Sequence, residues 1–275
     1  MLLREVEYAR PQTVDDAVRI LAAHDGARPL AGGQTLINVM KARAASPDVL
    51  VDLQDLEELR GIRDTGNGAL EIGAMTTYAE LVADDAAGAR SILGEVAGGI
   101  ADVQVRNRGT IGGNVCFSDP TSHFPPLLLV MDAEFTIRAV DGERTVPASE
   151  FFVGVYMTAA GPGELLTRIT IPPGGQDGFA VVTVGRDGMA IVSAAASLNG
   201  GARVAIGCVG ATPVRLTEME QRIGGDFSVD NVGTAAQGAG ASLDPPSDVH
   251  ASADYRRHLA EVLAVRAVLR ARERR

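Results

Sequence analysis

Two adjacent glycines in the stretch Thr110–Asn114 constrain this chain more than any other feature of its sequence. Residues without a Cβ allow the backbone to turn tightly and let a ligand approach closely. Thr110, Asn114 and Ser118 add short polar side chains, and Asp119-Pro120 predicts a turn that closes the segment. Backbone amides in such a turn can converge on an anion. The stretch therefore predicts a loop that binds an anionic group.

A second glycine pair of the same kind lies upstream, at Gly32-Gly33. It is followed by Leu36, Val39 and Met40 at helical spacing, so this loop is expected to precede a helix. The partial positive charge of a helix N-terminus suits an anion. Together the two pairs predict loops that hold one phosphate-bearing ligand from two sides. Ordinary turns in a chain with 32 glycines are the alternative.

The glycine spacing separates this chain from two well-known nucleotide-binding folds. Neither loop contains the G-x-G-x-x-G pattern of a Rossmann fold, and the G-K-S/T of a P-loop is missing. Residues 1–55 have the expected order helix, strand, helix, strand, in which Thr13 caps the first helix. We therefore expect a small α/β unit of a different kind.

A second unit is expected at residues 56–173. Two hairpins are predicted in it, with turns at Thr65–Gly68 and Asp141-Gly142, together with a strand at Leu165–Ile171. The expected helix starts are threonine, serine and proline positions: Thr76 or Thr77, Ser91, and Pro125-Pro126.

A third unit is expected at residues 178–275, after a predicted linker at Gly174–Gly178. Three strands are predicted at 179–185, 190–198 and 203–209, followed by helices. Arginines crowd the end of the last helix and favour a solvated tail that complements the helix dipole. A docking surface for an acidic partner is the alternative. These arginines are Arg266, Arg270, Arg272, Arg274 and Arg275.

Composition excludes several classes of function. The 35 acidic residues outnumber the 25 basic ones, so the basic footprint of a nucleic-acid-binding protein is missing. Cys116 and Cys208 form no C-x-x-C pair and are expected to be buried, and the four histidines form no H-E-x-x-H motif, so no metal site is expected. No signal peptide or membrane-spanning apolar run is apparent, so we expect a cytoplasmic protein without membrane insertion.

Four ordered motifs resemble the FAD-binding medium subunit of the molybdenum hydroxylases, a family that includes aerobic carbon monoxide dehydrogenase and xanthine dehydrogenase. These motifs are Ala31–Leu36, Ile72–Thr77, Ile100–Arg106 and Thr110–Asn114, and the resemblance covers essentially the whole chain. It implies an α+β fold of the vanillyl-alcohol-oxidase type. Two small α/β units, 1–55 and 56–173, would hold FAD between them. The C-terminal unit, 178–275, would combine a three-stranded antiparallel sheet with helices.

The resemblance also implies which residues contact FAD. The first loop would hold the pyrophosphate through Ala31, Gly32, Gly33, Gln34 and Thr35. The second would hold the pyrophosphate and the ribityl region through Thr110, Ile111, Gly112, Gly113 and Asn114. Ala101 would contact FAD just before this second loop, and Leu166 would lie near the flavin ring.

Two positions depart from the family pattern. His123 stands where family members usually carry Asp, and it either keeps an altered contact to FAD or points to solvent. Thr183 stands where they often carry Lys. Without that positive charge, the reduced, anionic flavin is expected to be less favourable.

The resemblance implies a division of labour among three subunits. A small partner subunit would carry 2Fe–2S clusters and a large partner the molybdenum pterin, so this chain would need no catalytic residue or metal of its own. Electrons would pass from the clusters to FAD and then to an external acceptor. Two alternatives stay open: a flavin-free structural subunit of the same type of complex, and a self-contained flavin oxidase.

Overall fold

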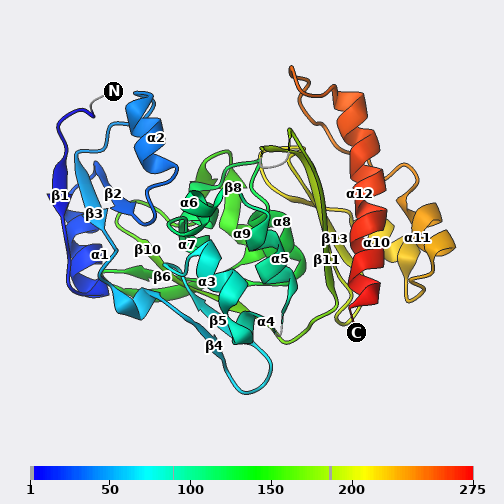
Figure 1. Ribbon diagram of the computed structural model, residues 1–275, viewed down its shortest axis with the longest axis horizontal. Helices are drawn as coiled ribbons and strands as arrows, with labels where there is room; N and C mark the ends of the chain where they lie inside the picture. The colour runs from blue at the N-terminus through cyan, green and yellow to red at the C-terminus, as the bar shows by residue number, and fades with distance from the viewer. Residues whose placement is uncertain (1–2, 89, 186–187, 275) are drawn as a thin grey trace.

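The computed structural model describes residues 3–88, 90–185 and 188–274. Three β-sheets succeed one another along the long axis of the molecule, from the N-terminal unit at one end to the C-terminal helices, within residues 217–273, at the other (Figure 1). The α+β class predicted from the sequence is confirmed. Among the described residues, no helix is both long and apolar enough to cross a lipid bilayer.

The first sheet is parallel, with the strand order β1 (Glu7–Ala9), β3 (Val49–Asp52) and β2 (Ala27–Leu30). Helix α1 (Val14–Ala23) packs against it, and the Thr13 hydroxyl caps this helix as predicted. The sequence pattern does not predict β1, because its three residues are largely exposed and show no alternation. Pairing with β3 defines it instead.

The second sheet is antiparallel throughout. Its strand order is β4 (Ile62–Asp64), β5 (Leu70–Gly73), β10 (Leu165–Ile171), β6 (Glu134–Ala139) and β7 (Gly142–Pro147). Both predicted hairpins are present, and the predicted strand β10 joins them. The rings of Phe135 and Phe151 stack in the core, with 3.9 Å between their centroids.

Short helices complete the second unit. They are η1 (Glu57–Leu59), α3 (Tyr78–Ala83), α4 (Asp85–Gly88), α5 (Ile92–Gly98), α6 (Val103–Arg106), α7 (Ile111–Phe117), α8 (Phe124–Val130) and α9 (Ala148–Phe151), with a hairpin of β8 (Phe152–Gly154) and β9 (Met157–Thr158). Thr77 caps α3 reciprocally with Glu80, as one of the two expected threonines. The predicted Ser91 cap is wrong, because the Ser91 backbone is itself helical and its hydroxyl accepts from Arg274.

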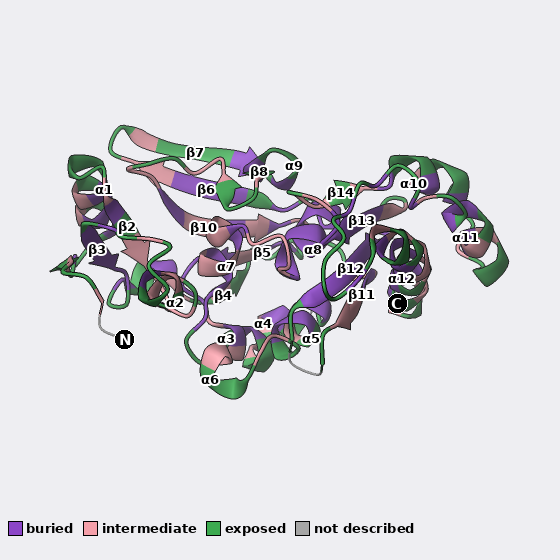
Figure 2. Cartoon of the chain, turned by 90° about the horizontal axis from the view of Figure 1, so that it is seen from above, coloured by how far each residue is buried: buried purple, intermediate pink, exposed green. Residues whose placement is uncertain are grey.

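The third sheet is antiparallel, with the order β11 (Asp177–Thr183), β12 (Ala190–Ser197), β13 (Arg203–Gly207) and β14 (Val214–Arg215). It contains the three predicted strands and a short fourth one. Helix α12 (Ala253–Glu273) packs on one face and α8 on the other, so every residue of β12 is buried (Figure 2). Helices α10 (Thr217–Ile223) and α11 (Val229–Ala236) complete the unit. The linker is shorter than predicted, because Asp177 and Gly178 already belong to β11.

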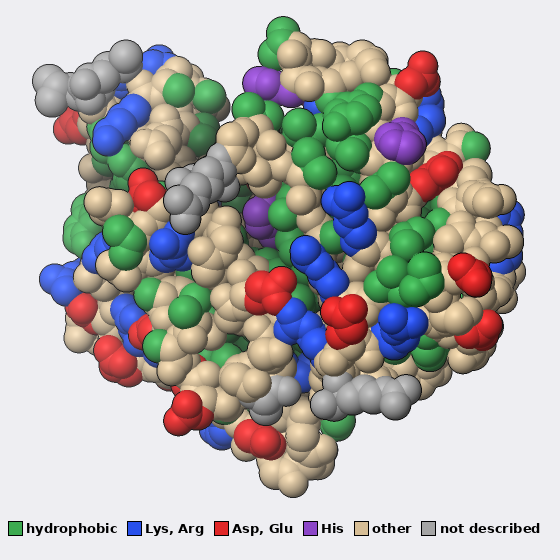
Figure 3. Space-filling model, turned by 45° about the vertical axis from the view of Figure 1, so that its right-hand side comes forward, with side chains coloured by type: hydrophobic (Ala, Val, Ile, Leu, Met, Phe, Trp, Pro, Cys, Tyr) green, Lys and Arg blue, Asp and Glu red, His purple; other side chains and the backbone are tan. Residues whose placement is uncertain are grey.

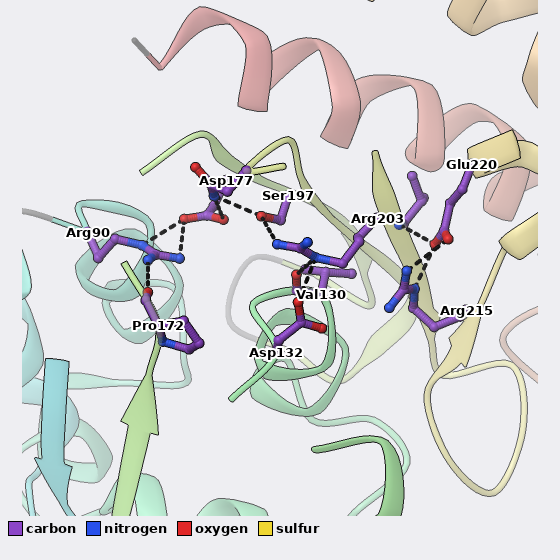
Figure 4. A network of polar contacts seen from close by, with 11 residues as sticks. Arg90, Val130, Asp132, Pro172, Asp177, Ser197, Arg203, Arg215 and Glu220 are labelled. Carbon is purple, nitrogen blue, oxygen red and sulfur yellow. Dashed lines mark hydrogen bonds and ion pairs between the residues drawn. The ribbon is translucent and has the colours of Figure 1, made fainter. Parts of the chain in front are cut away.

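A buried ion pair fixes the third unit to the second (Figure 4). Arg90 Nε donates to Asp177 Oδ2 at 2.9 Å, and the same guanidinium donates to the Pro172 carbonyl at 2.6 Å. Burial lowers the pKa of Arg90, and the Asp177 carboxylate counteracts this lowering. Across the same interface, Arg203 Nε donates to the Val130 carbonyl at 2.7 Å. Buried polar contacts therefore set how the two units sit together.

Of the arginines predicted to form a solvated tail on α12, Arg266 is exposed as expected, but three others bind the rest of the protein. Arg270 donates to the Phe179 carbonyl at 2.6 Å, and Arg272 to the Phe227 carbonyl at 3.0 Å. Arg274 pairs with Glu95 of α5. These side chains therefore attach the last helix to the body of the protein, while Arg275 lies outside the described residues.

Candidate functional site

A cavity of about 730 Å³ lies where the three units meet. Its wall comes from the loop after β2, the start of α7, the segment 119–123, strands β9 and β10, and residues 188–190 of the third unit. Figure 3 shows the surface hollowed between the N-terminal unit and the rest of the molecule. The volume falls in the range of about 300–1,000 Å³ that is typical of small-molecule sites.

The two glycine loops lie against each other in the wall of this cavity. A Cβ on Gly32 would lie only 1.9 Å from the Arg108 carbonyl oxygen, so glycine is required for this approach. A Cβ on Gly113 would lie 3.5 Å from the Ala31 Cβ. Both loops therefore face one cavity, which is the arrangement that a shared ligand requires.

The second loop differs from its prediction, because Thr110–Asn114 begins helix α7 rather than forming a turn. Thr110 Oγ1 caps this helix by accepting from the Gly113 amide at 3.0 Å. Two neighbouring glycines disfavour a helix by propensity alone, so tertiary packing overrides the local preference.

The first amides of α7 are engaged within the protein. The Ile111 amide donates to the Thr76 carbonyl at 3.0 Å, and the Gly112 amide donates to the Ala74 carbonyl at 2.9 Å. Gly112 is needed here, because a Cβ would lie 2.5 Å from that Ala74 oxygen. The expected convergence of these amides on an anion is therefore wrong, and Gly112 instead allows α7 to pack closely.

The first loop keeps its donors available. Within the part of the chain that the structure describes, the backbone amides of residues 32–35 donate to no protein acceptor. Gly33 has a φ of +71°, and the Gln34 side chain steadies the turn by donating to the Gly32 carbonyl at 3.1 Å. Helix α2 (Leu36–Lys41) follows, and the Thr35 hydroxyl does not cap it. Successive free amides around a left-handed residue form an anion-binding concavity.

Asn114 brings an unsatisfied acceptor to the cavity. Its Oδ1 is buried and accepts no hydrogen bond, although buried polar atoms are almost always paired. Burial raises the pKa of Tyr78 to about 12, and the Asn114 side chain is the neighbouring group that counteracts this shift. A ligand hydroxyl or amine in the cavity would satisfy the free oxygen.

His123 lies in the cavity wall, so the alternative that it points to solvent is wrong. The residue is 9% exposed, and its ring centroid lies 5.5 Å from that of Phe179 in β11. Burial lowers the pKa of His123 to about 4, so the ring is neutral near pH 7. A neutral imidazole offers one donor and one acceptor.

The structure brings most of the other predicted site residues to this cavity. Ala101 and Leu166 line it, Ala101 with a φ of +44° and Leu166 as a buried residue of β10. Ile111 and Thr183 do not line it. Ile111 is fully buried in the core, and the Thr183 hydroxyl donates to the Gly185 carbonyl at 2.6 Å. Ala190, the register partner of Thr183, faces the cavity in its place.

Several lining residues were not identified from the sequence. Tyr156 and Met157 come from the β8–β9 hairpin, which is too short to leave a periodic signal, and the Tyr156 ring lies 4.9 Å from that of Phe117. Cys116 also faces the cavity and is only partly buried. Desolvation raises the pKa of Cys116 to about 12, which keeps the thiol protonated and unreactive.

Two family models match this chain. The first, described as the FAD binding domain in molybdopterin dehydrogenase, matches residues 4–174. The second, described as the CO dehydrogenase flavoprotein C-terminal domain, matches residues 178–271. Together they cover nearly all of the chain.

Relatives and solved structures agree with these matches. The chain is 38% identical to the carbon monoxide dehydrogenase medium chain of Afipia carboxidovorans, covering 100% of this chain and 99% of that one. It is 35% identical to the glyceraldehyde dehydrogenase medium chain of Sulfolobus acidocaldarius, covering 96% and 97%. A chain of quinoline 2-oxidoreductase from Pseudomonas putida 86 superposes with a TM-score of 0.94 at 32% identity, covering 99% of both chains.

Proposed function

The chain belongs to the FAD-binding medium-subunit family of the molybdenum hydroxylases, and from this premise we propose that it transfers electrons inside a heteromeric oxidoreductase complex. Its cofactor is FAD. We further propose that its neighbours in the complex are a small iron–sulfur subunit and a large molybdopterin subunit. The names of the relatives support this, since they are medium chains or subunits of dehydrogenases and hydroxylases.

The cavity fits FAD by its own chemistry. The free amides of residues 32–35 can solvate a diphosphate without a positively charged side chain. The orphaned Asn114 oxygen requires a donor, which the hydroxyls of a ribose or ribityl chain provide. This pairing of free donors with an unsatisfied acceptor in one cavity is the observation that carries the proposal.

We assign the roles of the residues accordingly. Ala31, Gly32, Gly33, Gln34 and Thr35 would hold the pyrophosphate. From the second loop, Thr110, Gly112 and Gly113 would shape the wall and Asn114 would accept from the ligand, while Ile111 would act only through packing. Ala101, Leu166 and a neutral His123 would complete the wall, and Thr183 would act only through its neighbours. The division into residues 1–55, 56–173 and 178–275 belongs to the same proposal.

When bound, FAD would supply the two-electron redox chemistry that links the partner's clusters to an external acceptor. The chain itself binds and orients the cofactor. Its apolar lining residues, such as Leu166 and Tyr78, exclude water from the cavity wall. On this proposal the chain needs no general base of its own, and burial leaves the His123 ring and the Cys116 thiol uncharged near pH 7.

A visible absorption spectrum of the purified chain, before and after addition of FAD, tests this function. We expect an oxidised-flavin spectrum and the release of FAD, rather than FMN, on heating. The same measurement is then made on the complex isolated through a tag on this chain. Absence of flavin from both preparations would refute the proposal and favour a structural subunit. Turnover of an organic substrate by the isolated chain would favour a self-contained oxidase.

A further inference from the structure

A strained residue stands in the wall of the cavity. Ala101 has a φ of +44°, in the left-handed region where a Cβ crowds the following carbonyl. Glycine occupies such positions without this cost. An alanine keeps the conformation only where surrounding contacts enforce it, and such strain concentrates at ligand sites.

Arg106 supplies the enforcing contacts. Its Nη1 donates to the Ile100 carbonyl at 2.9 Å and to the Ala101 carbonyl at 2.6 Å. Hydrogen bonds from a charged donor are about twice as strong as neutral ones. Among the ion pairs of the described residues, none includes Arg106, so its charge is directed to these carbonyls. We call this closed loop, residues 100–106, the Arg106 clasp.

The clasp belongs to the wall of the cavity. Ile100, Ala101 and Val105 all line the cavity, and Asp102 closes the same loop a second time by accepting from the Val105 amide at 2.9 Å. The chain then continues directly to Gly109 and Thr110, which also line the cavity. Any relaxation of Ala101 would therefore change the shape of this wall.

We propose that Arg106 is a positioning residue for the cofactor, which acts by holding the Ala101 turn in its left-handed conformation. The inference rests on the proposed function, because it needs FAD in this cavity. It assigns to Arg106 no contact with FAD and no role as a counter-charge for the phosphates. Helix α6 has four residues and ends at Arg106, so the guanidinium reaches back over the whole helix to the carbonyls before it.

FAD affinity of the cofactor-free chain, measured by fluorescence titration, tests the proposal, with the melting temperature as a second readout. Arg106→Ala should weaken FAD binding about tenfold, equivalent to ~1.4 kcal/mol. Arg106→Lys keeps the charge but lacks the guanidinium that places Nη1 against both carbonyls, so it should weaken binding about threefold. Adding Ala101→Gly to Arg106→Ala should restore affinity to within about twofold of wild type, because glycine adopts the turn without a clasp. Lys41→Ala, which removes an exposed charge from α2, is the matched control.

The outcomes separate the inference from the function on which it rests. If the wild-type chain and its complex bind no FAD, the proposed function fails. If the wild type binds FAD and Arg106→Ala binds equally well, the inference is overturned, whatever the melting temperature does. Full affinity in Arg106→Lys, or no recovery on adding Ala101→Gly, would show that charge matters rather than the turn, and would also overturn it. If Arg106→Ala does not fold, Arg106→Lys with and without Ala101→Gly gives the same comparison.

Discussion

The contact between the two glycine loops predicts a specific cost for Gly32→Ala. The new Cβ would lie 1.9 Å from the Arg108 carbonyl oxygen, which is a backbone atom and cannot rotate away. Ordinary van der Waals contact begins at 3.4 Å, so the loops must separate by about 1.5 Å. Gly32 has no positive φ, so backbone strain does not contribute.

Overpacking of this kind costs about 1–3 kcal/mol. If the loops stay together in the cofactor-free protein, the cost lowers the free energy of unfolding. If they separate to relieve the clash, the cost appears when FAD draws them back, and affinity falls by a factor of about 5 to 150. The two losses should therefore add up to about 1–3 kcal/mol.

Urea unfolding of the cofactor-free protein and FAD titration measure both losses. Gly233→Ala is the control, because its Cβ would meet no atom within 4 Å in the middle of α11. It should leave FAD affinity unchanged and stabilise the fold by up to about 1 kcal/mol. If Gly32→Ala changes neither quantity by more than about 0.5 kcal/mol, the loops do not meet as described and the argument is refuted.

Three further predictions concern buried polar groups. Burial lowers the pKa of His123 from 6.5 to about 4, so between these pH values the unfolded chain binds a proton that the folded chain does not. The free energy of unfolding should therefore fall from pH 6.5 towards pH 4, by up to about 3 kcal/mol in the wild type. Urea unfolding of His123→Gln should show less of this fall. Asn114→Ala removes the buried oxygen that accepts no hydrogen bond, so FAD titration should show an affinity about tenfold weaker. The cofactor-free protein should lose little stability. An unchanged FAD affinity would mean that no ligand donor reaches this oxygen. Arg90→Met leaves Asp177 buried without its cation and should lower the free energy of unfolding in urea by about 3–5 kcal/mol. The double variant Arg90→Met/Asp177→Leu should recover much of this loss. A loss below about 1 kcal/mol in Arg90→Met would contradict the buried ion pair.

Local chemistry in the sequence determined a large part of the fold. The caps at Thr13 and Thr77 and the hairpin turns before β5 and β7 depend on contacts within a few residues, so their patterns can be read directly. Strands β10 and β12 can also be predicted, because burial in a sheet favours their apolar and β-branched residues. Short, exposed elements such as β1 and the β8–β9 hairpin carry no such pattern and form only through their partners.

For the site, the sequence determined which segments matter, and the tertiary structure decided what each of them does. The glycine pairs and the ordered motifs identified two loops, which lie side by side at one cavity. Whether their amides are free depends on acceptors distant in the chain, so only the structure shows that Gly112 donates to Ala74 while residues 32–35 keep their donors. Likewise, burial among distant segments makes His123 a neutral wall residue, whereas the Thr183 hydroxyl donates locally, to the Gly185 carbonyl. Local sequence fixes what a residue can donate or accept, but packing fixes which partner it meets, because the partners come from all three units.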